Sequence, residues 1–212
     1  MRVLPILFNA DMVRAILDGR KTVTRRVVKP SIGDSCPNCG QIHSEFTKIK
    51  TVQNLYCTRC GFPHKAPYQS GDILYVRESI WQKVGHTLNV DGETEVVWIR
   101  LFKYVASDEN PESWEWVRRS SIHMPKEAAR IWLKVTNVKV ERLKDIDTLG
   151  CQCEGIDITR NGVFKRFSLL WNSTIKKADL DRYGWEANPW VWVIRFERCE
   201  KPEENEPAGS QE

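Results

Sequence analysis

The sequence predicts an α+β protein in which short strands outnumber helices. Segments rich in β-branched residues recur along the chain, bounded by glycine, asparagine and aspartate. A few stretches instead space their apolar residues at helical intervals. No internal repeat occurs, and no apolar run approaches the length of a membrane helix. These patterns are typical of a mostly β globular domain with a few short helices.

The first element is a short amphipathic helix with a glycine turn behind it. Its apolar residues recur at helical spacing: Met12, Val13, Ile16 and Leu17. Asn9 stands where a helix N-cap belongs, and Gly19 stands where a C-terminal cap belongs. Residues 22–28 then become β-branched, which predicts a strand.

Further elements follow from the same two periodicities. Strands are expected at 73–77, 96–105, 130–142 and 190–197, with a hairpin turn at Asp91-Gly92. Helical spacing predicts a helix at 164–176, and a short helical turn is expected at 125–129. Residues 107–121 are expected to form a long loop. Trp132 and Trp192 are expected in the core, while Trp81, Trp114, Trp185 and Trp190 border loops and are candidates for stacking on bases.

Charge is distributed unevenly along the chain, whose formal net charge is +4. Residues 2–29 carry seven basic and two acidic side chains. This excess favours an anionic partner such as RNA, DNA or a nucleotide, although a solvated basic face is the alternative. Residues 198–212 are acidic and contain two prolines, and we expect them to be disordered. No signal peptide or membrane partner is indicated, so a cytoplasmic protein is expected.

Two C-x2-C pairs, separated by 17 residues, predict a metal site. They comprise Cys36, Cys39, Cys57 and Cys60. This spacing fits a zinc ribbon inserted at residues 31–66, and four thiolates would close the coordination sphere around a structural Zn²⁺. Two disulfides are the competing interpretation, which a cytoplasmic location disfavours.

The octet Gly19-Arg20-Lys21-Thr22-Val23-Thr24-Arg25-Arg26 concentrates basic and hydroxyl side chains at the corner between helix and strand. It resembles the Gly-x-Lys-x-x-(Glu or Thr)-x-Arg signature of the ASCH domain family, which Gly19, Lys21, Thr24 and Arg26 match. Residues 71–78, 121–125 and 185–192 are similar to ASCH proteins common in phages and prophages. The resemblance implies that residues 1–197 form a PUA-like, partly open β-barrel with two or three short helices.

The resemblance also implies an activity, because small bacterial ASCH proteins include N4-acetylcytidine amidohydrolases. Thr24 then matches the nucleophile and Lys21 its base. Residues 143–156 resemble the later helix of these enzymes, and Glu154 near its end matches the acid that protonates the leaving amine. A lysine base must be desolvated or crowded by other cations to lose its proton near neutrality. Lys21 and Thr24 converge only if Lys21 lies on the turn ahead of the strand. No organic cofactor is expected.

Further basic side chains are candidates for holding phosphate or a developing oxyanion. They are Arg20, Arg25, Arg26, Arg77 and His123. The alternative function is an RNA-binding module in which the same basic corner binds phosphate. Such a module would either have no catalytic activity or act as a metal-independent ribonuclease. Some ASCH proteins are similar to that description.

Overall fold

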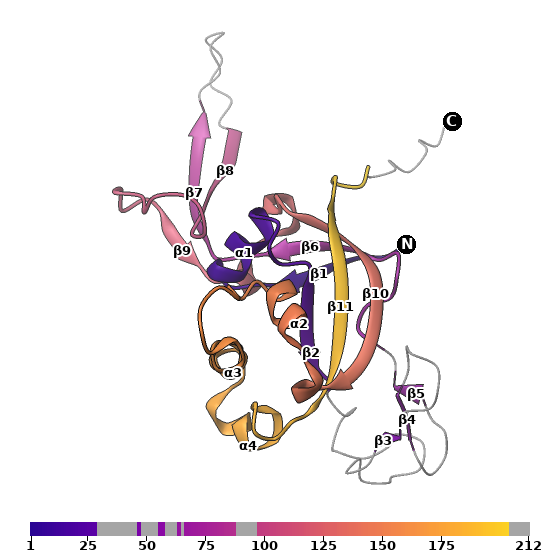
Figure 1. The fold of residues 1–212 in the computed structure, drawn as a ribbon. Helices are drawn as coiled ribbons and strands as arrows, with labels where there is room; N and C mark the ends of the chain where they lie inside the picture. The colour runs from indigo at the N-terminus through magenta and orange to yellow at the C-terminus, as the bar shows by residue number, and fades with distance from the viewer. Residues whose placement is uncertain (29–45, 48–54, 58–62, 65, 88–96, 204–212) are drawn as a thin grey trace, which may run out of the picture. The chain divides into compact units, whose positions relative to one another are not determined.

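The computed structural model describes residues 1–28, 46–47, 55–57, 63–64, 66–87 and 97–203. The chain forms two compact units from interleaved segments, and we describe each unit by itself (Figure 1). The first unit combines Met1–Ala10, Gly71–Lys134 and the segment from Glu197 onward. The second unit combines Asp11–Ser70 and Val135–Phe196.

Strands dominate the described residues, which confirms the predicted α+β class. The strands are β1 (Val3–Leu7), β2 (Val23–Val27), β3 (Phe46–Thr47), β4 (Leu55–Cys57), β5 (Pro63–His64), β6 (Ile73–Arg77), β7 (Ile80–Thr87), β8 (Val97–Tyr104), β9 (Val117–Arg119), β10 (Trp132–Arg142) and β11 (Trp190–Cys199). The α-helices are α1 (Ala10–Leu17), α2 (Thr148–Cys153), α3 (Val163–Ser173) and α4 (Leu180–Tyr183). Single 3₁₀ turns cover Ser121–His123, Lys126–Ala128, Leu143–Asp145 and Lys177–Asp179. None of the helices in these ranges has the length and apolar character needed to cross a membrane.

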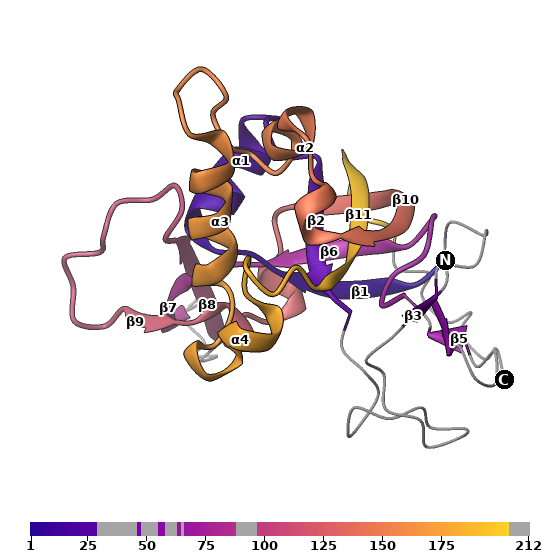
Figure 2. The same cartoon turned by 60° about the horizontal axis from the view of Figure 1, so that its bottom comes forward.

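The second unit is built on the antiparallel pair of β2 and β11, with β10 on the other side of β11 (Figure 1). Thr24 lies opposite Ile194 and Arg25 opposite Val193. One face of this pair packs against α2 and α3, which lie beside β2 in Figure 2. The cluster between them is formed by Val23, Leu143, Ile146, Cys151, Phe167, Trp171, Val191 and Val193. Because β2 is the last strand in this order, its outer edge pairs with no other strand of the described residues.

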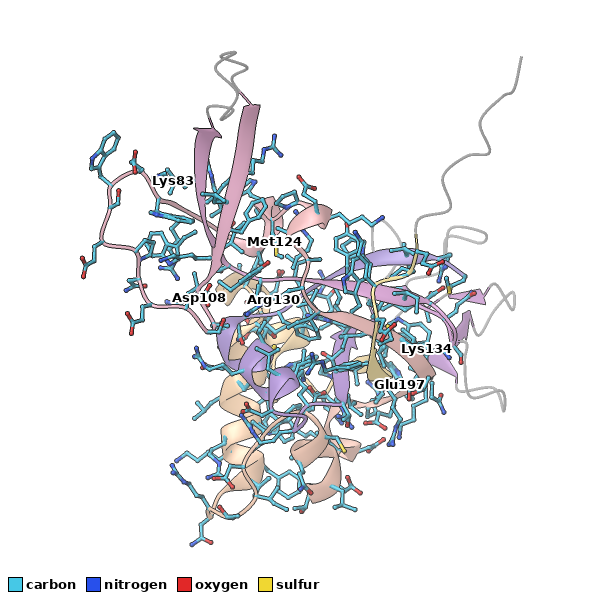
Figure 3. The ribbon with its side chains drawn as sticks, turned by 90° about the horizontal axis from the view of Figure 1, so that it is seen from above. Lys83, Asp108, Met124, Arg130, Lys134 and Glu197 are labelled. Atoms are coloured by element: carbon cyan, nitrogen blue, oxygen red, sulfur yellow. The ribbon has the colours of Figure 1, made fainter. Side chains whose placement is uncertain are left out.

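The first unit contains two groups of strands. Parallel β1 and β6 pair in register from Val3 and Ile73 onward, and β6 pairs with the start of β10. The other group has the order β8-β7-β9. Figure 3 marks Met124, Asp108 and Arg130, which come from three segments around the base of β7 and β8. Met124 packs on Ile80 there, and the Arg130 guanidinium lies 3.9 Å from the centre of the Tyr104 ring.

Most predicted elements are confirmed, and the errors have local causes. The 143–156 segment is not one helix, because the Asp147 side chain accepts a 2.6 Å hydrogen bond from the Gly150 N–H and begins α2 there. The predicted loop at 107–121 contains β9. Trp81 lies inside β7 and not at a loop, and the described residues hold four α-helices where two or three were expected. β11 continues through Cys199, into the segment that was expected to be disordered.

Candidate functional site

Lys21 lies on the turn between α1 and β2, as convergence with Thr24 requires. Gly19 has a positive φ of 72°, which a residue without a Cβ adopts readily. The N–H groups of Arg20 and Lys21 then both reach the Ala15 carbonyl oxygen, at 2.8 and 2.9 Å. This turn places Lys21 in an isolated antiparallel bridge with Glu154.

Glu154 caps the end of α2 and meets the Lys21 side chain directly. The helix is held beside β2 by a 2.9 Å hydrogen bond from the Thr22 N–H to the Cys153 carbonyl oxygen. The Lys21 ammonium lies 2.5 Å from Glu154 Oε2. It also donates to the backbone carbonyl oxygens of Val23, at 2.8 Å, and of Glu154, at 3.1 Å. One of these acceptors is the carbonyl group bonded to the Thr24 nitrogen.

Arg25 extends this ion pair into a chain of alternating charges. Its guanidinium lies 3.1 Å from Glu154 Oε1 and donates twice to Glu141 Oε1, at 3.0 and 2.7 Å. Lys139, whose side chain is half exposed, lies 2.8 Å from Glu141 Oε2. Burial opposes ionisation of Glu141, but hydrogen bonds from Lys139 and the charge of Arg25 outweigh it and lower the pKa of this carboxyl. The chain Lys21–Glu154–Arg25–Glu141–Lys139 thus runs from the interior to the surface.

The Lys21–Glu154 pair is deeply buried, with residue exposures of 2% and 5%. Burial lowers the pKa of Lys21, and the charges of Arg26 and Arg25 lower it further, while the Glu154 carboxylate acts in the opposite direction. Desolvation thus prevails over the partner, as it does for many buried ion pairs. A lysine in this setting gives up its proton more readily than a free lysine does.

Thr24 lies in the strand three residues after Lys21 and is 2% exposed. Within the described part of the chain, its hydroxyl makes no side-chain hydrogen bond. Successive strand residues point to opposite faces, so Thr24 shares its face with Arg26 and not with Arg25. Burial lowers the pKa of Arg26, and the nearby Tyr68 and Glu154 act against that shift. Burial raises the pKa of Tyr68, which Arg26 opposes.

The remaining candidates for binding divide between the two units. Arg20 is half exposed, pairs with Asp18 at 2.7 Å and donates to the Gly155 carbonyl oxygen at 3.0 Å. Arg77 and His123 belong to the first unit, where Arg77 donates to the Ile122 carbonyl oxygen and His123 ends a 3₁₀ turn. The structure therefore brings together Lys21, Glu154 and Arg25, with Arg26 and Thr24 on the adjoining strand.

A pocket of about 360 Å³ opens beside the same strand. It is lined by Arg25, Arg26, Val27, Trp171, Thr174, Ile175, Lys176, Asp179 and Tyr183. Lys21, Thr24 and Glu154 are not among its lining residues, so the pocket adjoins the buried pair and does not contain it. Its volume lies within the usual range for small-molecule sites, and it joins aromatic rings to basic side chains.

Most of the predicted zinc ligands lie outside the residues that the structure describes. Cys36, Cys39 and Cys60 lie outside the described residues, and of Cys57 the structure describes the backbone alone. Within the ranges that it describes, no group of three or more histidine, cysteine, aspartate or glutamate side chains is placed to hold a metal ion. Burial raises the pKa of the Cys151 thiol to about 11, which argues against this thiol as a nucleophile.

Sequence reasoning missed two members of this site. Glu141 is 116 residues from Arg25, and only the pairing of β10, β11 and β2 relates the two. Tyr68 belongs to a segment without periodicity. A single sequence carries no signal for either contact, whereas the local helix–turn–strand pattern was sufficient to place Lys21.

Comparison of the chain with protein-family models, with curated proteins and with solved structures finds no match. The interpretation of the site therefore depends on its own geometry.

Gly155 provides a first test of that geometry. It has a φ of 93°, and a Cβ added there would lie 2.8 Å from the Ala15 Cβ and 3.4 Å from the Lys21 Cβ. We expect Gly155→Ala to lower the free energy of unfolding by about 1–3 kcal/mol and to displace Glu154. Gly19→Ala is the matched control, because φ there is also positive but no atom lies within 4 Å of the added Cβ. Urea denaturation measures the stability of both variants. A larger loss in Gly19→Ala than in Gly155→Ala would contradict the geometry.

Proposed function

We propose that this protein is a hydrolase that removes an acyl group from the exocyclic amine of a cytidine-type nucleobase. The observation that carries the proposal is the buried Lys21–Glu154 pair, 2.5 Å between Nζ and Oε2, beside the backbone of Thr24. Such a pair supplies both an acid and a base after one proton moves between them. The sequence resemblance to the ASCH amidohydrolases assigns the same three residues to the chemistry.

In the proposed reaction, Lys21 first passes a proton to Glu154, which leaves a neutral amine beside a neutral carboxylic acid. The amine then takes the hydroxyl proton of Thr24 while Oγ1 attacks the acyl carbonyl carbon. Collapse of the tetrahedral intermediate breaks the C–N bond, and Glu154 protonates the departing exocyclic amine. Departure of the amine restores the ion pair, and water then hydrolyses the ester on Thr24, which releases the carboxylic acid and regenerates the Thr24 hydroxyl.

Arg25 and Arg26 receive different roles in this proposal. Arg25 is 7% exposed and is engaged by Glu154 and Glu141, so we assign it to orienting the carboxyl group of Glu154 and not to holding substrate. Arg26 shares its strand face with Thr24 and lines the pocket, so we assign it to the oxyanion or to a phosphate of the substrate.

The 360 Å³ pocket is our candidate for the nucleoside itself. The rings of Trp171 and Tyr183 supply apolar surface, while Thr174 and Asp179 supply hydrogen-bonding groups. Arg26 lines the pocket and shares its strand face with Thr24, so we propose that a nucleoside held there directs its acylated amine past Arg26 toward the nucleophile. The strand pairs and helices of the second unit are consistent with the partly open PUA-like barrel of ASCH domains, which we retain as part of the proposal.

A panel of N4-acylated cytidines tests the function directly. We expect the full chain to release cytidine from N4-acetylcytidine or a close acyl homologue, measured by the change in ultraviolet absorbance and by chromatography. EDTA should leave the initial rate unchanged, because a four-thiolate zinc has no open position for catalysis. Release of no cytidine from any member of the panel would contradict the proposal.

Glu154→Gln tests the role of the acid. The amide keeps the size of the side chain but cannot transfer a proton, so kcat/KM should fall by about 10² to 10⁴. Glu186→Gln is the control, because that carboxylate is exposed and pairs with Lys144 at the surface. An unchanged rate in Glu154→Gln would remove this residue from the mechanism.

We also propose a structural Zn²⁺ on Cys36, Cys39, Cys57 and Cys60. The support is the spacing of the two C-x2-C pairs in the sequence. Protein purified without chelator should carry about one zinc per chain by elemental analysis, and Cys57→Ser should lose it. Cys199→Ser is the control, because that cysteine lies on β11. Zinc-free wild-type protein would contradict this proposal.

A further inference from the structure

The three-stranded sheet β8-β7-β9 carries a row of cations and aromatic rings on one face. Arg118 of β9 lies opposite Trp81 of β7, and Trp81 lies opposite Lys103 of β8. Residues directly opposite each other share a sheet face, so these side chains form one row across all three strands. Lys83 and Leu101, two positions further along, continue the same face. Figure 3 labels Lys83 on β7.

This face is open to solvent within the first unit. Leu101 is 41% exposed, and Arg118 of β9 is exposed as well. The opposite face is covered at its base, where Ile80 packs against Met124 and Ala128. A sheet with one covered face ordinarily carries scattered polar side chains on the other, whereas here cations alternate with large aromatic rings.

The cations of the row are held by rings and not by carboxylates. The Arg118 guanidinium lies 6.0 Å from the centre of the Trp81 ring, and Lys103 Nζ lies 5.3 Å from the centre of the Trp116 ring. Among the described residues, neither cation forms an ion pair. Lys83 differs, because it pairs with Glu115. The positive charge of Arg118 and Lys103 thus remains available to an anionic ligand.

One tryptophan of the row adds a group that a nucleobase can use. The buried indole N–H of Trp81 has no hydrogen-bond partner in the described part of the chain. Lys103 and Arg118 stand on the two strands flanking β7, about 10 Å apart from one strand to the other. At this spacing the two cations can contact successive phosphates of a strand, and the ring between them can stack on an exposed base.

We propose that this face, defined by Trp81, Lys103, Trp116 and Arg118, binds single-stranded RNA. Bases can stack on aromatic side chains only when they are unpaired, so a duplex does not fit the same chemistry. The choice of RNA over DNA rests on the proposed function, because a cytidine-type substrate belongs to RNA. The surface would hold the strand, while the Lys21–Glu154 corner of the second unit carries the chemistry.

Fluorescence anisotropy of a labelled single-stranded RNA of about 15 nucleotides, measured with the full chain, tests this surface. The double variant Lys103→Gln/Arg118→Gln should weaken binding at least about tenfold. It should also reduce the slope of log Kd against log salt by about 1.4, at about 0.7 for each phosphate contact. Trp81→Leu should weaken binding by about 5- to 100-fold. Lys165→Gln/Arg195→Gln, which removes two exposed cations from the second unit, is the matched control and should stay within about twofold of wild type.

Three comparisons decide between this surface and its alternatives. Equal affinity of the Lys103→Gln/Arg118→Gln variant and the control would overturn the proposal, and so would tighter binding of duplex RNA or of the corresponding single-stranded DNA. Arg118→Gln alone keeps the test valid if Trp81→Leu fails to fold, because Arg118 is exposed. The surface variants should retain turnover of free N4-acetylcytidine, and Thr24→Ala should retain RNA binding. Failure of the RNA surface is therefore distinguishable from failure of the hydrolase.

Discussion

Thr24→Ala is expected to abolish turnover of N4-acetylcytidine while leaving the fold intact. The substitution removes the proposed nucleophile, and the loss of a nucleophile that acts with a base reduces kcat by roughly 10⁴ to 10⁶. The hydroxyl of Thr24 makes no side-chain hydrogen bond in the described part of the chain, so its removal should change the melting temperature little. Rates are measured by cytidine release and stability by thermal unfolding.

Thr24→Ser and Thr22→Ala complete the comparison. The serine variant preserves a hydroxyl and should keep measurable activity. Thr22 lies two residues earlier, and its contacts to Cys153 and Phe196 use the backbone, so Thr22→Ala should remain active. If Thr24→Ala retained activity similar to that of Thr22→Ala, Thr24 would be a strand residue and not the nucleophile.

Lys21→Met is expected to lose both activity and stability. The proposed base disappears, which should lower kcat/KM by at least about 10² to 10⁴. Glu154 remains buried with Arg25 as its other cationic partner, so the free energy of unfolding should fall by about 3 kcal/mol, the low end for a broken buried pair. Lys165→Met is the control, since that lysine is exposed on α3 and does not line the pocket. An unchanged stability of Lys21→Met would contradict the buried ion pair.

The pH dependence of the wild-type enzyme reports on the same lysine. Burial lowers the pKa of Lys21 below its ordinary value of 10.5. The reactive Lys21–Glu154 pair holds one proton, so kcat/KM should fall once rising pH removes that proton, and this fall should begin below pH 10.5. A rate that stayed constant up to that pH would mean that an unperturbed lysine holds the proton.

Local features of this protein were predictable from its sequence, and long-range contacts were not. The helix, glycine turn and strand from Ala10 to Val27 followed from periodicity and capping residues. β1 escaped prediction because Pro5 interrupts it, which the structure accommodates by placing β1 first in the strand order. β7 was missed because a polar Gln82 and Lys83 follow Trp81 at its start. The Arg25–Glu141 contact depends on the order of three strands, which no single-sequence pattern specifies.

The Lys21–Glu154 contact is a different case, because its prediction came from a family resemblance and not from periodicity. The sequence interpretation placed Glu154 at the end of a long helix, and the structure places it at the end of the much shorter α2. The residue still meets Lys21 because Cys153 and Thr22 join α2 to the start of the strand.

The central claim is that Lys21 and Thr24 act as one catalytic unit, and a double-mutant cycle tests it most directly. The measurement is kcat/KM for N4-acetylcytidine with wild type, Lys21→Met, Thr24→Ala and the double variant. Residues that act together are strongly non-additive, so the double variant should lie within about tenfold of the slower single variant. If the fall in kcat/KM of the double variant equalled the product of the two single falls, a shared role for the two side chains would be contradicted.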